Sequence, residues 1–288
     1  MKKLIIKFQG GFGNQLFQFA ISKKFEIIRN YQIIPDFNFY KNYKLHKNYI
    51  QYINFKHCGV ISFLSSSFFP TKFLFLFKKY LAFFSYKFVK EKDTLDYINF
   101  YNFNYKKIYL DGYWQNIKYF YEIESQIKNL LNHFLKKNKK KFLVKKNFYK
   151  TKKNIVMIHL RLKDYKNTSN VNKHGLLSIH YYFRAIKILN QKKSNNKFII
   201  FSDEVNLAKK KFAYLKEKIF FDEKNLLDPV TTMYYMTKCN DFIISNSTFS
   251  WWAAYLSKSI NKNIIYPINW YTNKKFKNIS CNNKWIKA

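Results

Sequence analysis

The stretch DFIISNSTFSWWAAYL, residues 241–256, passes from a short apolar run through four polar residues to a pair of tryptophans. This order is typical of a strand that ends in a tight turn and is followed by a packed helix. Ser247 and Thr248 suit the N-cap, and we expect the helix to begin near Ser250. Such a helix start offers backbone N–H groups and hydroxyls to an anion. An ordinary capped core helix has the same pattern, so the remaining sequence must decide between the two readings.

The second half of the chain repeats the alternation of strand and helix. Strand-like runs alternate with helix-like runs, the strands at 154–160, 197–201, 218–221, 241–245 and 263–266, and the helices at 180–192, 205–215, 228–239 and 250–259. This alternation predicts an α/β fold with a parallel sheet. Ligands of such sheets bind at the carboxyl ends of the strands.

The first half begins in the same manner. A strand is predicted at 3–8, followed by a glycine loop, a helix from about Asn14 and a strand at 31–34. The lysine-rich stretch 136–153 is the best linker candidate. We therefore predict two α/β domains, residues 1–140 and residues 154–288.

The high positive charge of the chain does not by itself identify a binding partner. Among 288 residues, 53 Lys and Arg against 16 Asp and Glu give a formal net charge of +37, which ordinarily indicates a nucleic-acid or anionic-membrane partner. Lys, Asn, Ile, Phe and Tyr are all abundant, however, as expected where AT-rich codons dominate, and we expect no nucleic-acid partner. The only arginines are Arg29, Arg161 and Arg184. Each therefore indicates a site that needs a planar guanidinium.

Cysteines and apolar runs bear on the cellular location. Cys58, Cys239 and Cys281 are odd in number and widely spaced, which argues against a disulfide framework and against a zinc site. The first apolar run is too short for a signal peptide, and no stretch is long enough to span a bilayer. We expect a cytoplasmic protein. The aromatic, lysine-punctuated segment 61–89 is either core of the first domain or a peripheral docking surface for the anionic inner membrane.

The glycine loop after the first strand is one candidate binding site. It reads GGFGNQ over residues 10–15, where glycines let the backbone approach a ligand closely. The loop partly matches a dinucleotide fingerprint, with Asp36 near the expected acidic position, but Leu16 stands where the third glycine belongs. A Rossmann-type NAD(P)-binding oxidoreductase is therefore an alternative. The substrate-binding residues that we predict here are Gly11, Gly13, Asn14 and Gln15.

Two further candidates follow predicted strands of the second half. His159 and Arg161 alternate along a strand and so share a face, with Asp164 just beyond. The arginine can clamp a phosphate, although an ion pair with Asp164 is an equal alternative. Ser202, Asp203 and Glu204 precede a helix, which the two acids could simply cap.

Several metal and nucleotide motifs are missing from the sequence. It contains no Asp-x-Asp triplet, no phosphate loop ending in Gly-Lys-Ser/Thr and no His-Glu-x-x-His. We therefore predict no carboxylate-held metal and no ATP-cleaving site.

Six motifs in sequence order resemble the α-1,2-fucosyltransferases of glycosyltransferase family 11, bacterial type. They are GGFGNQLFQFA at 10–20, DGYWQNIKYF at 111–120, IHLRLKDY at 158–165, HGLLSIHYYFRAI at 174–186, FSDE at 201–204 and SNSTFSWWAAYL at 245–256. The resemblance covers nearly the whole chain. It implies a GT-B-like fold of two Rossmann-like domains with a cleft between them, the first on the acceptor side and the second binding GDP-fucose.

The activity implied by the resemblance is an inverting, metal-independent and cofactor-free transfer of L-fucose. The donor is GDP-β-L-fucose, and the acceptor is the 2-hydroxyl of a galactoside in a surface glycan, lipid-linked or free. The implied partners are thus GDP-fucose and a galactose-terminated glycan.

The resemblance also implies roles for single residues. Arg161 matches the first arginine of the family's His-x-Arg-Arg-x-Asp motif, which grips the β-phosphate, and Leu162 replaces the second. His159 and Asp203 match positions that contact guanosine, and Ser247 and Thr248 add phosphate contacts. Ser202 and Asn246 complete the predicted binding set. The general base is open among Asp164, Glu204 and His174, the last preferred because it begins the family's His-Gly motif. The predicted catalytic residues are Arg161, Asp164 and His174.

Overall fold

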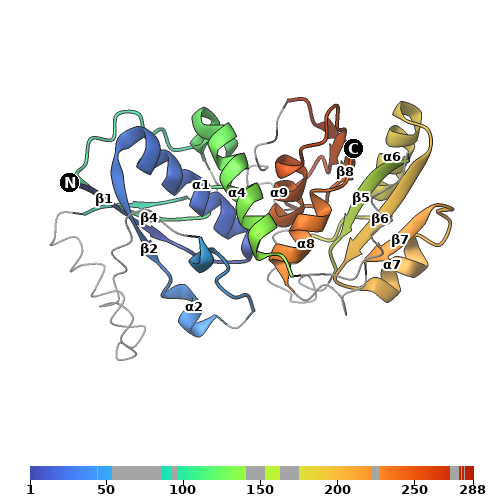
Figure 1. Ribbon diagram of the computed structural model, residues 1–288, viewed down its shortest axis with the longest axis horizontal. Helices are drawn as coiled ribbons and strands as arrows, with labels where there is room; N and C mark the ends of the chain where they lie inside the picture. The colour runs from blue at the N-terminus through green and yellow to red at the C-terminus, as the bar shows by residue number, and fades with distance from the viewer. Residues whose placement is uncertain are drawn as a thin grey trace. The chain divides into compact units, whose positions relative to one another are not determined.

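The computed structural model describes residues 1–43, 45–53, 86–92, 96–140, 153–162, 175–221, 228–272, 279, 281 and 283–288. The chain divides into two compact units, Met1–Ile127 and Lys128–Ala288. Each unit contains its own parallel sheet flanked by helices, which confirms the predicted α/β class (Figure 1).

The N-terminal unit is built on a sheet with the strand order β2-β1-β4-β3. Its strands are β1 (Lys2–Lys7), β2 (Tyr31–Asp36), β3 (Lys87–Lys90) and β4 (Lys107–Asp111). Its helices are α1 (Phe12–Arg29) and α2 (Phe39–Asn42), with 3-10 turns at Ile50–Tyr52, Ile117–Tyr119 and Tyr121–Ile123. The chain leaves β1 toward β2 on one side and later returns to β4 on the other. The strand order therefore reverses between β1 and β4.

Apolar residues of β1 and α1 form the centre of this unit. Leu4 and Ile6 on β1 and Leu16 on α1 are fully buried. Gly10 precedes α1 with φ of 76°, and a Cβ there would lie 2.7 Å from the Asn14 amide nitrogen. Only glycine fits this tight connection without strain. Residues 7, 36 and 111 end neighbouring strands at the same edge, because all the pairings are parallel.

The C-terminal unit has a larger sheet with the order β10-β9-β8-β5-β6-β7. Its strands are β5 (Asn154–Leu160), β6 (Asn196–Ser202), β7 (Lys218–Phe221), β8 (Asp241–Ile243), β9 (Ile264–Tyr266) and β10 (Ile286–Lys287). Its helices are α6 (Ile179–Lys192), α7 (Val205–Lys211), α8 (Pro229–Met236) and α9 (Thr248–Leu256), and α4 (Glu124–Asn138) spans the division between the units. The order reverses between β5 and β8. Open α/β sheets bind ligands in the crevice at such a point.

The predicted elements of this unit are largely confirmed. The strands at 154–160 and 218–221 have the predicted bounds, while α7 and α8 end earlier, at Lys211 and Met236. The helix expected near Ser250 begins at Thr248. Strands β3 and β4 and helix α4 were not predicted. The segment 61–89 lies outside the described residues except for 86–89, which include most of β3.

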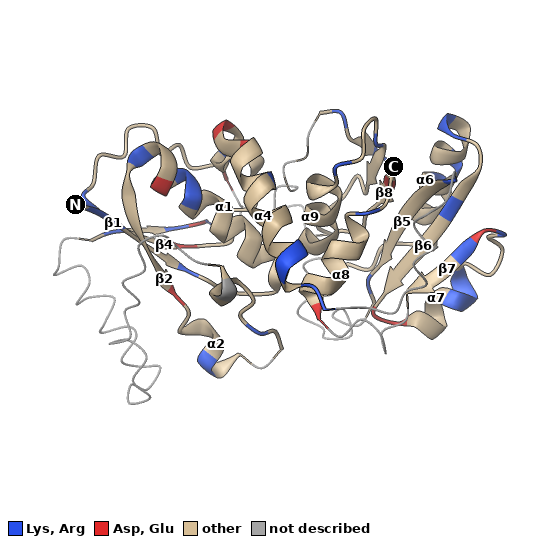
Figure 2. Cartoon of the chain, in the orientation of Figure 1, with Lys and Arg blue, Asp and Glu red and all other residues tan. Residues whose placement is uncertain are grey.

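Basic side chains are spread over both units. Lys and Arg occur on α1, α2, α4, α6 and α7 (Figure 2). Among the described residues, no helix combines the length and the apolar composition needed to cross a membrane.

Candidate functional site

Arg161 and Ser247 meet at the reversal point of the C-terminal sheet. Arg161 follows β5, and Ser247 follows the neighbouring strand β8. The Arg161 guanidinium donates a hydrogen bond from Nη1 to Ser247 Oγ over 2.9 Å. Two residues earlier along both segments, His159 Nδ1 and Ser245 Oγ are hydrogen-bonded at 2.7 Å. The alternation predicted for His159 and Arg161 thus brings both side chains to the same polar turn.

Ser247 is the N-cap residue of α9, but its side chain does not cap the helix. The predicted N-cap position is confirmed, but the Ser247 side chain makes no cap hydrogen bond, and its hydroxyl accepts from Arg161. A guanidinium is thus placed beside the positive end of a helix dipole. Trp251 and Trp252 are fully buried, and they hold the helix start rigidly behind the turn. A cation, a hydroxyl and a helix N-terminus together form an anion-binding arrangement.

Asp203 supports this arrangement from the end of β6. Its Oδ1 accepts a hydrogen bond from the Leu162 backbone N–H at 2.7 Å. Glu204 N donates to Ser202 Oγ at 3.0 Å, and Glu204 makes no side-chain cap bond to α7. Glu204 therefore occupies the N-cap position of α7 without capping it through its side chain. Asp203 instead fixes the backbone directly after Arg161.

Asn246 and Thr248 complete the predicted residues that the structure describes at this turn. Asn246 is 4% exposed, and its amide nitrogen donates to Gly175 O at 3.2 Å and Trp270 O at 3.3 Å. The Asn246 side chain therefore ties the turn to two other segments. Thr248 is the first residue of α9. Asp164 and His174 lie outside the described residues.

The predicted residues of the N-terminal unit surround the Gly10–Gln15 loop. Gly11 is the N-cap residue of α1, and Gly13 is buried in its first turn. Asn14 Oδ1 accepts a hydrogen bond from Gln115 Nε2 at 2.9 Å. These contacts bring the loop next to the segment that follows β4.

Gln15 in this loop is fully buried. Its amide nitrogen donates to Gly10 O at 3.1 Å and Lys47 O at 2.9 Å, and its oxygen accepts from Tyr49 N at 2.9 Å. Both amide hydrogens are thus used on the backbone. Gln15 holds residues 47–49 against the glycine loop.

Sequence reasoning missed three residues that shape these sites. Ser245 orients His159, and Tyr182 donates its hydroxyl to His159 O at 3.1 Å. Glu91, which is 7% exposed, accepts hydrogen bonds from Tyr113 N and Trp114 N. Ser245 adjoins the predicted Asn246, so the sequence carried a signal for it. Tyr182 lies within the resembling motif at 174–186, which was a signal for it, whereas Glu91 lies in none of the six motifs.

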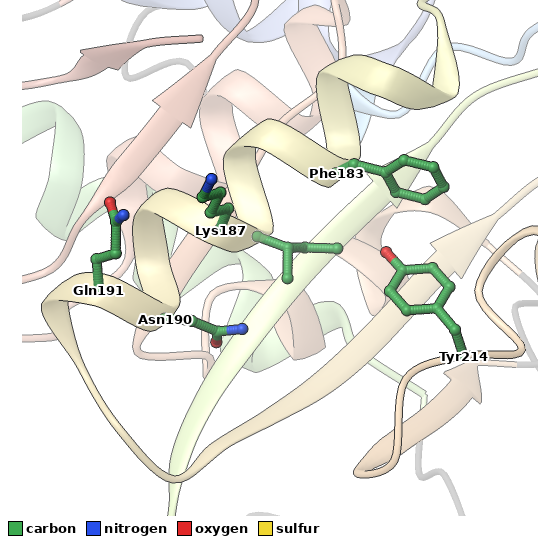
Figure 3. Close-up of a pocket in the computed structure, with 6 residues that line it drawn as sticks. Phe183, Lys187, Asn190, Gln191 and Tyr214 are labelled. Carbon is green, nitrogen blue, oxygen red and sulfur yellow. The ribbon is translucent and has the colours of Figure 1, made fainter.

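An open, mainly apolar hollow lies on the outer side of α6 (Figure 3). Its volume is about 590 Å³, and it is lined by Phe183, Ile186, Lys187, Asn190, Gln191 and Tyr214. The Phe183 and Tyr214 rings meet edge to face, with 5.2 Å between their centroids. None of the predicted site residues lines this hollow. The convergent polar groups described above lie instead at the strand ends.

Among the residues that the structure describes, no group of three or more His, Cys, Asp or Glu side chains is arranged to hold a metal ion.

The sequence of the chain is similar to those of known glycosyltransferases. Residues 3–287 match the sequence model described as Glycosyl transferase family 11. An O-antigen biosynthesis glycosyltransferase, WbnK of Escherichia coli, is 32% identical over 119 residues, which cover 41% of this chain and 39% of WbnK. An Alpha-1,2-colitosyltransferase of Escherichia coli is 28% identical over 186 residues, covering 61% of each chain. The matched region thus spans less than two thirds of either relative.

Solved structures resemble the fold at low sequence identity. A mutant of FUT1 from Arabidopsis thaliana, in complex with GDP, has a TM-score of 0.50 and 9% identity over 96% of this chain and 72% of that chain. This likeness concerns the fold alone. The two Rossmann-like units correspond to the GT-B class, as predicted from the sequence.

Proposed function

The chain belongs to glycosyltransferase family 11, and from this premise we propose that it transfers L-fucose from GDP-β-L-fucose to the 2-hydroxyl of a galactoside. The transfer inverts the anomeric centre. The observation that carries this proposal is the 2.9 Å contact between Arg161 and Ser247 at the start of α9. It lies at the reversal point of a parallel sheet, where a nucleotide diphosphate is expected.

Arg161 and α9 have a defined task in this reaction. When the bond between fucose and the β-phosphate breaks, negative charge grows on the departing GDP. A guanidinium and backbone N–H groups that are already in place stabilise that charge without reorganising. They can therefore serve where other glycosyltransferases use a metal ion, and we propose that neither a metal nor a cofactor is needed. Ser247 and Thr248 add hydroxyls to the same anion site.

Asp203 and His159 are proposed to border the guanosine part of the donor. Asp203 accepts from Leu162 N through Oδ1, so its carboxylate is held in a fixed orientation beside Arg161. His159 is held by Ser245 and, through its carbonyl, by Tyr182. Such constraint lowers the reorganisation needed when a ligand binds.

The acceptor hydroxyl must lose its proton as the new bond forms. A base must lie within hydrogen-bond reach of that hydroxyl, and His174, Asp164 and Glu204 remain the candidates. Of these, only Glu204 lies in the described part of the chain, at the start of α7. The N-terminal unit is proposed to bind the acceptor.

The oxidoreductase alternative gains no support, because the Asp36 carboxylate accepts hydrogen bonds from Tyr109 and Asn38.

A second candidate is transfer of colitose in place of fucose. The relative named Alpha-1,2-colitosyltransferase supports it. Colitose is fucose without the 3-hydroxyl, so an enzyme built to bond that hydroxyl would discriminate strongly against the deoxy sugar. The relative named for O-antigen biosynthesis supports a surface polysaccharide as the acceptor class in either case.

Two measurements test the proposed function. Differential scanning fluorimetry with GDP, NADH and an oligonucleotide should show stabilisation by GDP alone, roughly 2.7 kcal/mol at a hundred times its dissociation constant. NMR of the products formed from lactose with GDP-fucose or GDP-colitose should then show an α linkage at the galactose 2-position. Stabilisation by NADH but not GDP, or transfer to another hydroxyl, would contradict the proposal.

A further inference from the structure

The turn that follows β4 in the N-terminal unit has an unusual backbone. It comprises Asp111–Asn116, and Trp114 within it has φ of 58°, the left-handed region that bulky residues avoid. Trp114 is also fully buried, and its carbonyl accepts a hydrogen bond from Asn116 N at 2.8 Å. Strained conformations of this kind persist only where the surroundings enforce them, and they cluster at functional sites.

Glu91 is the residue that enforces this turn. Its carboxylate accepts from Tyr113 N at 2.6 Å and from Trp114 N at 3.0 and 3.1 Å. A buried carboxylate is costly unless charge-assisted hydrogen bonds compensate it, as they do here. Gly112 allows the close approach, since a Cβ there would lie 2.4 Å from Glu91 Cβ. One acidic side chain after β3 thus shapes the turn after β4.

The turn presents Tyr113 and Gln115 to the glycine loop. A Cβ on Gly10 would lie 3.0 Å from Tyr113 Cε1, so the tyrosine ring rests directly on the loop. Gln115 donates to Asn14 at 2.9 Å, and the His46 ring packs over Gly11, 3.3 Å from a Cβ built there. These side chains are all partly exposed. Burial raises the pKa of Tyr113, so its phenol stays neutral.

These side chains lie at the reversal point of the N-terminal sheet. The glycine loop follows β1 and the turn follows β4, and the strand order of the N-terminal sheet reverses between these two strands. Ligands bind at such a reversal point in open parallel sheets. Tyrosine and imidazole rings offer apolar faces, while amide groups supply both donors and acceptors for hydroxyls. That combination suits a neutral sugar ring.

We propose that Tyr113, Gln115, Asn14 and His46 form a pyranose-binding subsite for the acceptor galactoside, and that Glu91 is its positioning residue. This inference rests on the proposed function and extends it to named residues. The Tyr113 ring packs against the apolar face of the sugar, and the paired amides of Gln115 and Asn14 bond its hydroxyls. Glu91 acts through the turn and does not touch the sugar.

Saturation-transfer difference NMR with methyl β-D-galactoside, on the full chain with GDP present, tests the subsite without requiring turnover. Wild type should transfer saturation to the galactose ring protons. Tyr113→Ala, Gln115→Leu and Glu91→Gln should each reduce the transfer by about fivefold or more, because each removes a contact or its support. The matched control is Arg29→Met. It removes hydrogen bonds to Phe100 O and Phe103 O in the same unit without touching the turn.

Kinetics separate positioning from general destabilisation. Glu91→Gln should raise KM for the galactoside about tenfold while leaving KM for the donor and the slow hydrolysis of the donor by water unchanged. No saturation transfer in wild type, or an equal loss in Arg29→Met, would overturn the subsite. Galactoside binding without transfer from either GDP-sugar would instead leave the subsite standing and contradict the proposed function.

Discussion

At the reversal point of the C-terminal sheet stand a guanidinium, hydroxyls and a helix N-terminus, whereas the N-terminal sheet carries amides, aromatic rings and a buried carboxylate at the same position. Arg161 donates to Ser247 in the first, and Gln115 donates to Asn14 in the second. The backbone plan is shared, since both are parallel sheets with a reversal in strand order. The difference in charge fits the two ligands proposed above, an anion and a neutral sugar.

The largest effect that separates the two regions is expected at Arg161. Arg161→Lys keeps the positive charge but loses the planar guanidinium, which can donate two parallel hydrogen bonds to a phosphate. The substitution should remove roughly 3 kcal/mol of transition-state stabilisation, or about a hundredfold in turnover. Initial rates with saturating donor measure the loss, and thermal unfolding should hardly change.

The control for Arg161 is Arg184→Lys on α6. The turnover of this variant should fall much less than that of Arg161→Lys if Arg184 is only structural. Near-normal turnover of a folded Arg161→Lys variant would mean that Arg161 does not carry the leaving-group charge.

Gln15 should behave differently, because its amide is hydrogen-bonded to the backbone at three points. Gln15→Ala leaves Lys47 O, Gly10 O and Tyr49 N without these partners, and it should cost about 2 kcal/mol of unfolding free energy. Urea unfolding measures this, and the dissociation constant of GDP should stay unchanged. A weakened GDP affinity at wild-type stability would argue that Gln15 belongs to the anion site.

Ser247→Ala tests the hydroxyl that orients Arg161. Loss of this charge-assisted hydrogen bond should lower turnover by about tenfold, less than loss of the guanidinium fork. Ser250, whose hydroxyl donates to Ser247 O at 3.1 Å, provides the comparison. If Ser250→Ala lowers turnover as much as Ser247→Ala does, the effect comes from the helix start as a whole.

The smallest effect is expected from metal removal. If Arg161 and the α9 start stabilise the departing diphosphate as proposed, excess EDTA should leave the rate of sugar transfer unchanged. Rates in EDTA and after adding back Mn²⁺ or Mg²⁺ provide the measurement. An enzyme that loses activity in EDTA and recovers specifically with either metal would contradict the metal-free donor site.

The sequence predicted which residues lie at the ends of individual strands better than it predicted the contacts between neighbouring strands. Alternation along β5 placed His159 and Arg161 on one face, but their partners lie 86 residues away and depend on the β5–β8 pairing. Ser247 looked like a helix cap, since nothing local in the sequence shows that Arg161 reaches its hydroxyl.

The N-terminal site was less predictable for a related reason. The role of Glu91 depends on the pairing of β3 with β4, where Glu91 N donates to Asp111 O at 2.9 Å. Neither strand was predicted, so the sequence analysis assigned no role to Glu91. Gln15 was predicted as a ligand contact from its motif alone, and a motif does not show that residues 47–49 fold back onto it.

Isothermal titration of wild type and Arg161→Lys with GDP and with guanosine tests the central claim most directly. If the Arg161–Ser247 site receives the diphosphate, wild type should bind GDP about a hundredfold more tightly than guanosine, a difference of roughly 2.7 kcal/mol. Arg161→Lys should weaken the binding of GDP by about tenfold and leave the affinity for guanosine unchanged. Equal affinities of wild type for GDP and guanosine, or an unchanged GDP affinity in Arg161→Lys, would contradict the assignment of this site to the diphosphate.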